Sequence, residues 1–421
     1  MIKKQTLIKI PLLVVACALA GWFLLTLAYC LPVARMDSHA RNSAYLFEAE
    51  YQSTGGYKEL TGDRGSTPDY LSDAVMLLTA AYDSPHPAWK AALLVELEGV
   101  GEHWAHESIV LLASDDADSL EKSVREYDRY WEGFLVFIKP LFWLFGYGKL
   151  RHIQIFLHMA LFTLLQIQLY RYKRTLCLPF FLAWVFLNPP VIMLCMFYSC
   201  NTLLAQAVML LILFIYAKRG PDAAADADFW CLFFTLLGCA TIYFDFLSHP
   251  LLTLGLPLLL WIALFETNRV RTDAARIIGL SACWTFGYGG MWGMKWVIIS
   301  LFTEKNIMQE VWNQIRIRTD VTEFSYAEVL ANNVSSSGVA VFFLPVVAAA
   351  LVAGIVLGRR DMRRLLPYLL IGAYPFVWYF VLQEHSYVHA HYTYRLLSIT
   401  IFAFLAILIR ELYDVRMRKE K

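Results

Sequence analysis

The stretch IKIPLLVVACALAGWFLLTLAYCL, residues 8–31, decides the fold class of this chain. It is long enough to cross the hydrocarbon core of a bilayer as a helix, which takes about 20 predominantly apolar residues. The composition agrees, because 58% of the residues are hydrophobic and only 17% are charged, whereas soluble domains carry about 25% charged residues. We therefore expect an all-α polytopic membrane protein that forms a single membrane domain over residues 1–421.

Comparable apolar stretches recur along the chain and predict about ten transmembrane helices. They lie at about 8–31, 151–170, 176–196, 201–217, 229–247, 250–266, 277–301, 338–358, 365–383 and 395–411. The pattern is interrupted between the third and fourth stretches by Asn188-Pro189-Pro190.

Basic residues predict the orientation of these helices. Lys3, Lys4 and Lys9 lie at the start of the first span and place the amino terminus in the cytoplasm. No small-x-small cleavage site follows this span, so we expect it to be retained rather than removed as a signal peptide. The chain should then lie in the plasma membrane with both termini in the cytoplasm. Lys and Arg also gather in the segments that this topology places inside, at 171–174, 218–219, 269–276, 359–364 and from Arg410 onward.

The same topology places a long polar segment, residues 32–150, outside the membrane. We expect this first extracytoplasmic loop to be folded, because apolar residues recur in it at helical spacing. A second extracytoplasmic loop, residues 302–337, contains an amphipathic stretch. The expected helices are 70–82, 88–97, 118–131, an interfacial helix over 134–147 that Lys139-Pro140 breaks, and the amphipathic stretch 304–318.

Several function classes find no support in the sequence. The net charge is +1, so no overall electrostatic field favours nucleic acid as a partner. There is no Walker motif or other Gly-rich phosphate loop, which disfavours nucleotide hydrolysis. The eight cysteines show no Cys-x-x-Cys pattern and are interpreted as small packing residues.

Asp69 and Asp73 are the strongest candidates for catalysis. Their i, i+4 spacing places both carboxyl groups on one face of the expected helix. Two carboxylates that close either share a proton or bind a divalent cation such as Mg²⁺ or Mn²⁺, and both arrangements suit a general base. The structural alternative is a helix cap at Asp69 and a solvated Asp73. The cluster Asp115-Asp116-Ala117-Asp118 is a weaker candidate, because acids before a helix mostly serve its dipole.

Other polar residues gather where later spans reach the outer face, which favours an outward-facing site over a pump. In the first loop, Arg129, Tyr130 and Trp131 combine a guanidinium for a phosphate or carboxylate with aromatic rings for a sugar. The segment 384–391 is rich in histidine but lacks the His-Glu-x-x-His order of zinc peptidases, so pocket lining is favoured over a metal site. The candidate ligands at the outer ends of the spans are Asp245, His249, Lys295, His385, His389 and Arg395.

Four strings carry a resemblance that covers most of the chain: PDYLSDAVML (68–77), RYWEGFLVFIKPL (129–141), YFDFLSHPLLTLGLPL (243–258) and QEHSYVHAHYTYRLL (383–397). They resemble uncharacterised bacterial multi-span proteins grouped near the GT-C class of integral-membrane glycosyltransferases. The resemblance implies transfer of a sugar from a polyprenyl-phosphate carrier, with Asp73 or Asp69 as the base. It also implies that Arg129, Arg395, Lys295 and the histidines hold the phosphate or the sugar. Glu132 departs from the pattern, since members of that group often carry His there.

The leading expectation is therefore a GT-C-like glycosyltransferase of the cell envelope that acts at the outer membrane face. Its partners would be the lipid bilayer, a polyprenyl-linked sugar donor and a glycan or polymer acceptor, with no nucleic acid. Two alternatives stay open: a flippase or transporter for a lipid-linked glycan, and a non-catalytic membrane assembly partner. The assembly-partner hypothesis would fail if the acids of the first loop converged with Asp245, His385 and Arg395 in one pocket.

Overall fold

The computed structural model describes residues 3–51, 58–267, 269–319, 324–338, 349, 352 and 365–419. Within these residues the chain is predominantly helical, with one two-stranded sheet. Five described helical segments are long and apolar enough to cross a membrane, so the chain is a helical membrane protein. These segments are Lys4–Tyr29, Tyr147–Phe186, Met196–Arg219, Ala227–Phe244 and Ala390–Arg410.

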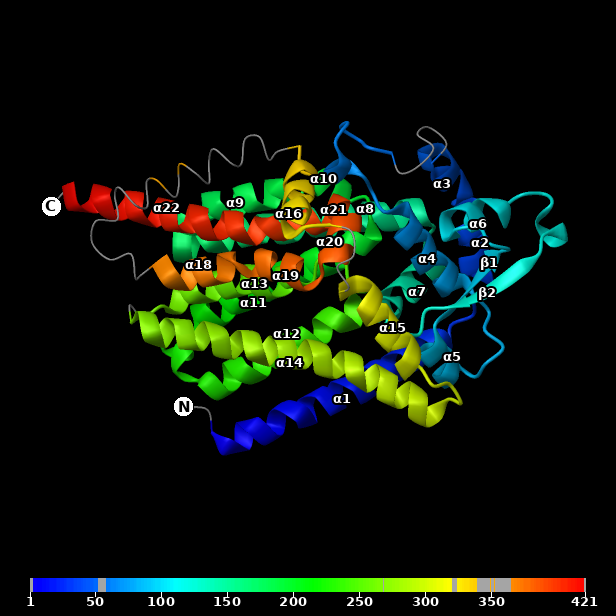
Figure 1. Ribbon diagram of the computed structural model, residues 1–421, viewed down its shortest axis with the longest axis horizontal. Helices are drawn as coiled ribbons and strands as arrows, with labels where there is room; N and C mark the ends of the chain where they lie inside the picture. Colours follow the sequence, from blue (N-terminus) through cyan, green and yellow to red (C-terminus); the bar gives the residue numbers. More distant parts are fainter. Residues whose placement is uncertain are drawn as a thin grey trace.

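The elements form an elongated bundle with a smaller polar part at one end (Figure 1). The polar part consists of α2 (Ala34–Asn42), α3 (Ala44–Tyr51), η1 (Arg64–Ser66), α4 (Tyr70–Ala81), α5 (Ala88–Leu94), β1 (Glu96–Val100), α6 (Ala105–Leu111), η2 (Ala117–Ser119) and β2 (Lys122–Glu126). The remaining elements are α1 (Lys4–Tyr29), α7 (Leu135–Leu144), α8 (Tyr147–Lys173), η3 (Arg174–Leu176), α9 (Cys177–Phe186), α10 (Pro189–Ile192), α11 (Met196–Arg219), η4 (Pro221–Ala225), α12 (Ala227–Phe244), α13 (Leu251–Phe265), α14 (Val270–Phe302), α15 (Met308–Thr319), α16 (Tyr326–Ser335), α18 (Leu366–Gly372), α19 (Tyr374–Val381), α20 (Gln383–Val388), α21 (Ala390–Thr393), η6 (Tyr394–Leu396) and α22 (Leu397–Lys419).

Small residues let the helices of the bundle approach closely. A Cβ added to Gly238 of α12 would lie 2.0 Å from the carbonyl oxygen of Trp284. A Cβ added to Gly287 of α14 would lie 2.1 Å from the carbonyl oxygen of Thr235. Close backbone contact is a main source of helix association in lipid, where burial of apolar side chains gains little. These two glycines therefore hold α12 and α14 together.

The start of α1 and the end of α22 lie at the same end of the bundle, opposite the polar part (Figure 1). Charged residues gather at this end in pairs. The Lys3 ammonium lies 3.6 Å from Asp228, and Arg410 lies 2.6 Å from Glu266. The opposite end carries the loops that join the polar part to the bundle.

The polar part confirms some expectations and corrects others. The helix expected over 70–82 is α4, which runs from Tyr70 to Ala81. The helix expected over 88–97 ends earlier, at Leu94, because Val95 adopts a left-handed conformation with φ 51°.

The prediction of a helix over 118–131 is wrong. Only the short η2 forms there, and Lys122–Glu126 is the strand β2, paired antiparallel with β1. The capping pattern at Asp118 is local, whereas a strand gains its hydrogen bonds from a partner elsewhere in the chain.

Prolines account for the other differences. Pro140 lies inside α7 and does not break it, because Leu135, Lys139 and Phe142 are buried against neighbouring elements and Lys139 donates to the Ala80 carbonyl at 2.7 Å. The stretch 176–196 forms two helices, α9 and α10, since Asn188 adopts φ 61° directly before Pro189. The stretch 338–358 lies largely outside the described residues.

Candidate functional site

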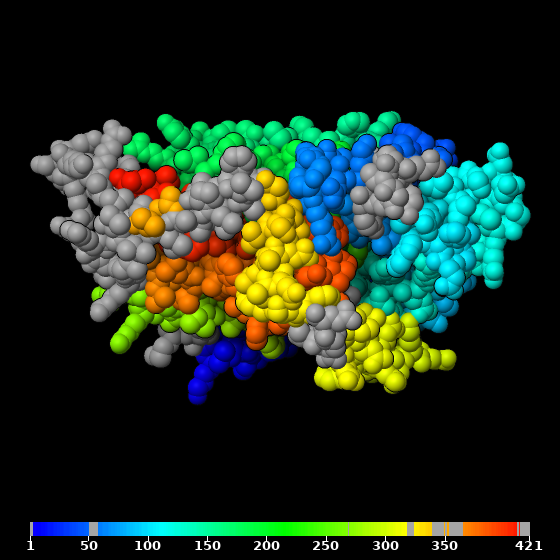
Figure 2. Space-filling view, turned by 45° about the horizontal axis from the view of Figure 1, so that its top comes forward, coloured from blue at the N-terminus to red at the C-terminus, as the bar shows by residue number. Residues whose placement is uncertain are grey.

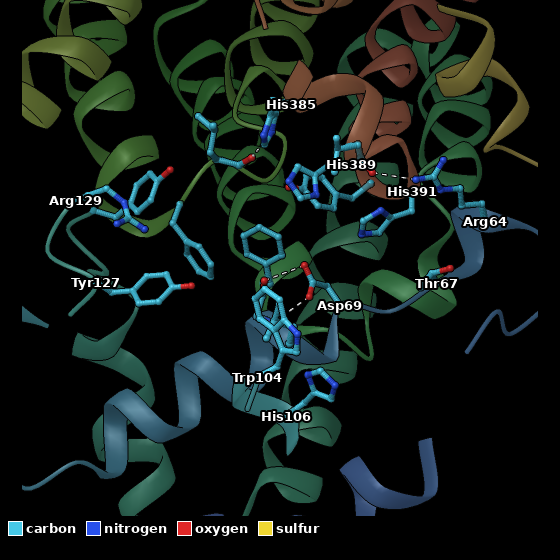
Figure 3. Close-up of a pocket in the computed structure, with 18 residues that line it drawn as sticks. Arg64, Thr67, Asp69, Trp104, His106, Tyr127, Arg129, His385, His389 and His391 are labelled. Atoms are coloured by element: carbon cyan, nitrogen blue, oxygen red, sulfur yellow. Dashed lines mark hydrogen bonds between the residues drawn. The ribbon is translucent and has the colours of Figure 1, made fainter. Parts of the chain in front are cut away.

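A cavity of about 690 Å³ lies where the polar part meets the bundle. We call it the polar cavity. The first loop contributes one wall, and the connection between α12 and α13 contributes the other together with residues of α11, α20 and α21 (Figure 3). Its lining residues are Arg64, Thr67, Asp69, Leu71, Ser72, Trp104, His106, Tyr127, Arg129, Tyr130, Phe197, Phe246, Leu247, His385, Val388, His389, His391 and Tyr392.

Asp69 is the only carboxylate among these lining residues. It caps the amino terminus of α4, where its side chain accepts hydrogen bonds from the Ser72 amide at 2.9 Å and the Ser72 hydroxyl at 2.8 Å. Burial raises the pKa of Asp69 to about 6, although the hydrogen bonds from Ser72 oppose the shift. A carboxylate with a pKa near the working pH is suited to general-base catalysis.

Asp73 does not line the polar cavity. Its carboxylate is fully buried and accepts hydrogen bonds from the amides of Met196 and Phe197, both at 3.0 Å. The Tyr147 hydroxyl donates a third at 2.5 Å. A negative charge at the amino terminus of a helix is stabilising, and Asp73 occupies that position at α11. Its contacts are those of an anchor that ties α4 to the bundle.

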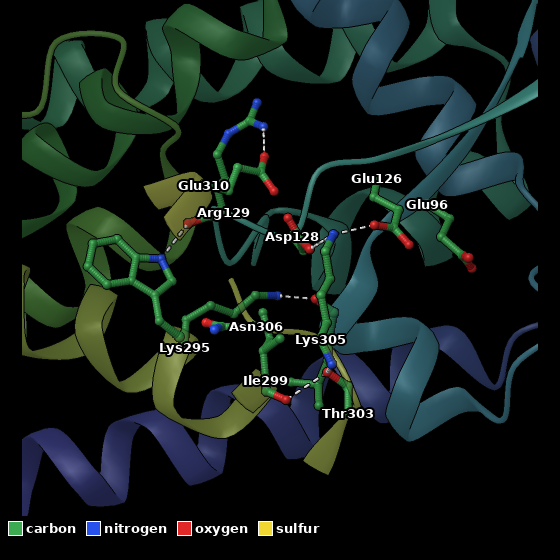
Figure 4. A network of polar contacts seen from close by, with 12 residues as sticks. Glu96, Glu126, Asp128, Arg129, Lys295, Ile299, Thr303, Lys305, Asn306 and Glu310 are labelled. Atoms are coloured by element: carbon green, nitrogen blue, oxygen red, sulfur yellow. Dashed lines mark hydrogen bonds and ion pairs between the residues drawn. The ribbon is translucent and has the colours of Figure 1, made fainter. Parts of the chain in front are cut away.

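Arg129 and Tyr130 form one end of the polar cavity. The Arg129 guanidinium pairs with Glu310 of α15 at 2.5 Å (Figure 4). The backbone carbonyl oxygen of Arg129 accepts from the Trp292 indole at 2.7 Å. The Tyr130 ring stacks on the Trp292 ring at a centroid distance of 5.5 Å. These contacts hold the Arg129 charge at a fixed place in the wall.

The histidine-rich segment forms another part of the wall. His385 hydrogen-bonds through Nε2 to the Leu247 carbonyl at 3.1 Å, and its ring lies 4.9 Å from that of His389. The His389 ring stacks on Tyr392 at 5.1 Å. No group of three or more His, Cys, Asp or Glu residues in the described part of the chain is placed to hold a metal ion.

The other candidate ligands lie behind the cavity wall. Asp245 accepts from the Leu247 and Ser248 amides at 3.0 and 3.1 Å and shapes the corner between α12 and α13. His249 hydrogen-bonds to the Tyr198 carbonyl at 3.1 Å. Both side chains are buried.

Trp131, Lys295 and Arg395 are also fully buried. The Trp131 indole donates to the Met291 carbonyl at 2.8 Å, and Lys295 donates to the Leu93 carbonyl at 2.8 Å. Arg395 donates to the carbonyls of Leu187 and Gly65 at 2.9 and 3.1 Å. The hydrogen bonds of all three are therefore to backbone that supports the wall.

The structure also adds residues that the sequence patterns did not single out: Arg64, Thr67, Trp104, His106 and Tyr127. The Gly62-Asp63-Arg64-Gly65 run was the available signal for Arg64, since glycines on both sides allow a tight backbone course. Glycine is required at position 65, because a Cβ there would lie 2.2 Å from the Ser336 carbonyl oxygen.

Searches of protein-family models, curated proteins and solved structures found no match to this chain.

Proposed function

We propose that this protein is a membrane glycosyltransferase that transfers a sugar from a polyprenyl-phosphate carrier to a cell-surface acceptor. The observation that carries the proposal is the position of Asp69. Its carboxylate lines the same cavity as Arg129, His385 and His389, at the junction between the membrane bundle and the polar part. This arrangement supplies an acid–base group, a cation and hydrogen-bond donors within one cavity.

In the proposed reaction the acceptor hydroxyl attacks the anomeric carbon of the donor sugar. The new bond joins the acceptor oxygen to that carbon, and the bond between the carbon and the phosphate oxygen breaks. Asp69 takes the proton of the hydroxyl, and the electron pair of the broken bond leaves on the lipid phosphate. Arg129 stabilises the negative charge of the departing phosphate, and histidine donors stabilise it further. Aromatic rings such as Tyr127 and Tyr130 offer faces for the sugar.

A second space supports a lipid-linked donor. An apolar groove of about 470 Å³ runs between α7, α8 and α11 and is lined by side chains such as Phe134, Leu157 and Leu204. Phe134 packs against Phe246 of the polar cavity at 5.7 Å, so one layer of aromatic side chains separates the two spaces. A hydrocarbon chain in the groove would leave its head group beside the cavity.

We further propose that the chain crosses the plasma membrane about ten times, with both termini in the cytoplasm and the polar cavity outside. Two observations support this orientation. The start of α1 and the end of α22 lie at the same end of the bundle, opposite the polar part (Figure 1). The basic residues Lys3, Arg219 and Arg410 lie at the ends of candidate membrane spans and are paired with acids, at positions that the positive-inside rule assigns to the cytoplasm.

A transporter for a lipid-linked glycan would need a polar path from this cavity into the bundle. The bundle contributes aromatic side chains to the cavity wall. The Phe197 ring packs against the Phe246 ring at a centroid distance of 4.4 Å and against the Tyr392 ring at 5.6 Å. A packed aromatic wall supports a cavity that ends there, which favours the enzyme over the transporter.

The test is sugar transfer by the purified protein in proteoliposomes, assayed with a panel of radiolabelled polyprenyl-phosphate sugars. We expect Asp69→Asn to abolish transfer while the protein inserts normally. Asp115→Asn is the matched control, since Asp115 is an exposed acid of the same loop, and it should keep full activity. Full transfer by the Asp69 variant would remove the assignment of Asp69 as the base.

A further inference from the structure

The cationic side chains of the polar cavity lie at two separate ends. Figure 3 shows Arg129 and Tyr127 on one side, and Arg64, His389 and His391 on the other, with Asp69 between them. We call these the Arg129 end and the Arg64 end. A single phosphate group would contact only one of these ends, which leaves the second cationic end without a ligand.

The Arg129 end borders apolar space. Arg129, Tyr130 and Leu247 also line a small side pocket of about 90 Å³, whose other walls come from α14, α15 and Leu382 and include Trp292, Trp296, Val311 and Ile315. Beside it, Tyr130 packs against Phe246 at 6.2 Å, and Phe246 adjoins the apolar groove through Phe134. The face of α15 that carries Trp312 is exposed and apolar. This end therefore faces the side from which a membrane lipid would arrive.

The Arg64 end has a different setting. Arg64 is exposed, and its segment lies at the surface beside α16 (Figure 2). Its guanidinium is held by two neutral acceptors, the Asn332 side-chain oxygen at 3.1 Å and the Val388 carbonyl at 2.9 Å. Arg64 forms no ion pair with an acid in the described part of the chain. Among the described residues its charge is therefore positioned but not neutralised, and further N–H donors of the guanidinium are left for a ligand.

The charges of the two ends differ accordingly. At the Arg129 end, Glu310 compensates part of the positive charge. At the Arg64 end, the neighbours along the wall are His389 and His391, which add donors rather than negative charge. An anionic group at this end would gain charge-assisted hydrogen bonds, which are stronger than neutral ones.

We infer that the polar cavity holds two anionic groups at once, one at each end. The Arg129 end takes the phosphate of the lipid-linked donor. The Arg64 end takes a phosphate or carboxylate on the acceptor, which makes the acceptor an acidic glycan that reaches the cavity from the aqueous side. This inference rests on the proposed function for the names donor and acceptor. Asp69, which lies between the ends, is then placed where the two substrates meet.

The experiment is isothermal titration calorimetry on the full chain in dodecyl maltoside, with decyl phosphate as the lipid-like ligand and inorganic phosphate as the soluble one. Wild-type protein saturated with decyl phosphate should still bind one inorganic phosphate. Arg64→Gln should weaken that second binding by about tenfold, the effect of losing one charge-assisted hydrogen bond. Its affinity for decyl phosphate should change by less than about twofold.

Arg129→Gln should show the reverse pattern. Its affinity for decyl phosphate should fall by about tenfold, and its binding of inorganic phosphate at the Arg64 end should be retained. Arg64→Lys keeps the charge and should recover most of the second binding, which separates loss of a ligand from a folding defect. A circular-dichroism melt should show that all variants remain folded.

Three results would overturn the inference. One is absence of phosphate binding to the decyl-phosphate-loaded wild type. Another is a second binding event that Arg64→Gln leaves unchanged. The third is an equal loss of affinity for decyl phosphate in Arg64→Gln and Arg129→Gln, which would mean that the cavity has a single anion site. Because the titration needs no turnover, sugar transfer that fails while both ends bind would overturn only the proposed function.

Discussion

Asp69 and Asp73 lie one helical turn apart on α4, yet only Asp69 reaches the polar cavity. The Asp73 carboxylate is turned instead to the amino terminus of α11, where the Met196 and Phe197 amides donate to it. The two acids thus have different roles: Asp69 is available for chemistry, and Asp73 joins the polar part to the bundle. This difference gives the first prediction.

Asp73→Asn should lower the free energy of unfolding by about 2 kcal/mol, because it removes the charge that buried hydrogen-bond donors satisfy. Asp69→Asn should change it by less than about 0.5 kcal/mol, since Asn is as good a helix cap as Asp. Chemical denaturation of the purified protein measures both variants. Equal stability of Asp73→Asn and wild type would show that the contacts to α11 are not an anchor.

The pH dependence of transfer should report Asp69. Burial raises the pKa of Asp69 to about 6, and a base acts only when it is deprotonated. The value of kcat/KM should therefore rise as the pH increases through about 6 and level off above pH 7. Asp69→Glu should keep a pH-dependent limb, whereas Asp69→Asn should have no measurable rate. A wild-type profile that is flat between pH 5 and pH 7 would contradict this role.

Glu132 should make stability fall as the pH rises from about 4.5 to about 8. Its side chain is fully buried in the loop before α7, and neither carboxylate oxygen has a hydrogen-bond partner in the described part of the chain. Burial raises the pKa of Glu132 to about 8, although the charges of Lys295 and Arg129 oppose the shift. The folded chain therefore keeps a proton that the unfolded chain loses above a pH of about 4.5, so stability decreases as the pH rises from about 4.5 to about 8.

The measurement is the thermal midpoint of wild type and Glu132→Gln across pH 5 to pH 9. Gln keeps the shape of the neutral carboxyl group and cannot ionise, so its midpoint should fall less over this range. Acids shared by both proteins contribute equally to the two curves. Parallel curves would show that Glu132 does not control this pH dependence.

Lys305 should hold the second loop to the first. Its ammonium contacts both Glu126 and Asp128, and Asp128 is only 1% exposed (Figure 4). Lys305→Ala would leave the buried Asp128 carboxylate without this cation, and such losses cost about 3 kcal/mol. Glu126→Gln, at the exposed end of the same contact, should cost less than about 1 kcal/mol. Urea unfolding of the two variants gives the comparison, and similar losses in both would argue against a special role for Asp128.

Much of the architecture could be predicted from local pattern. Apolar stretches of membrane length became helices such as α1, α11 and α12, because in lipid the backbone must satisfy its hydrogen bonds within the segment. The helical spacing of apolar residues located α4. Other features depended on partners that are distant in the sequence. The strand β2 forms because it pairs with β1, and α7 continues through Pro140 because neighbouring elements pack against this helix.

The candidate site also combines features set by local sequence with features set by contacts between distant parts of the chain. The sequence by itself determined that this is a helical membrane protein, because length and apolar pattern act locally, and it offered a set of polar residues as candidates for the site. Only the tertiary structure decided which of those side chains share a cavity. Asp69, Arg129, Tyr130, His385 and His389 line it, whereas Asp73, Lys295 and Arg395 turn to buried partners. Arg64 joined the cavity through contacts to Asn332 and Val388, more than 200 residues away. Burial and hydrogen-bond partners belong to neighbours in space, and spacing along the chain does not contain them.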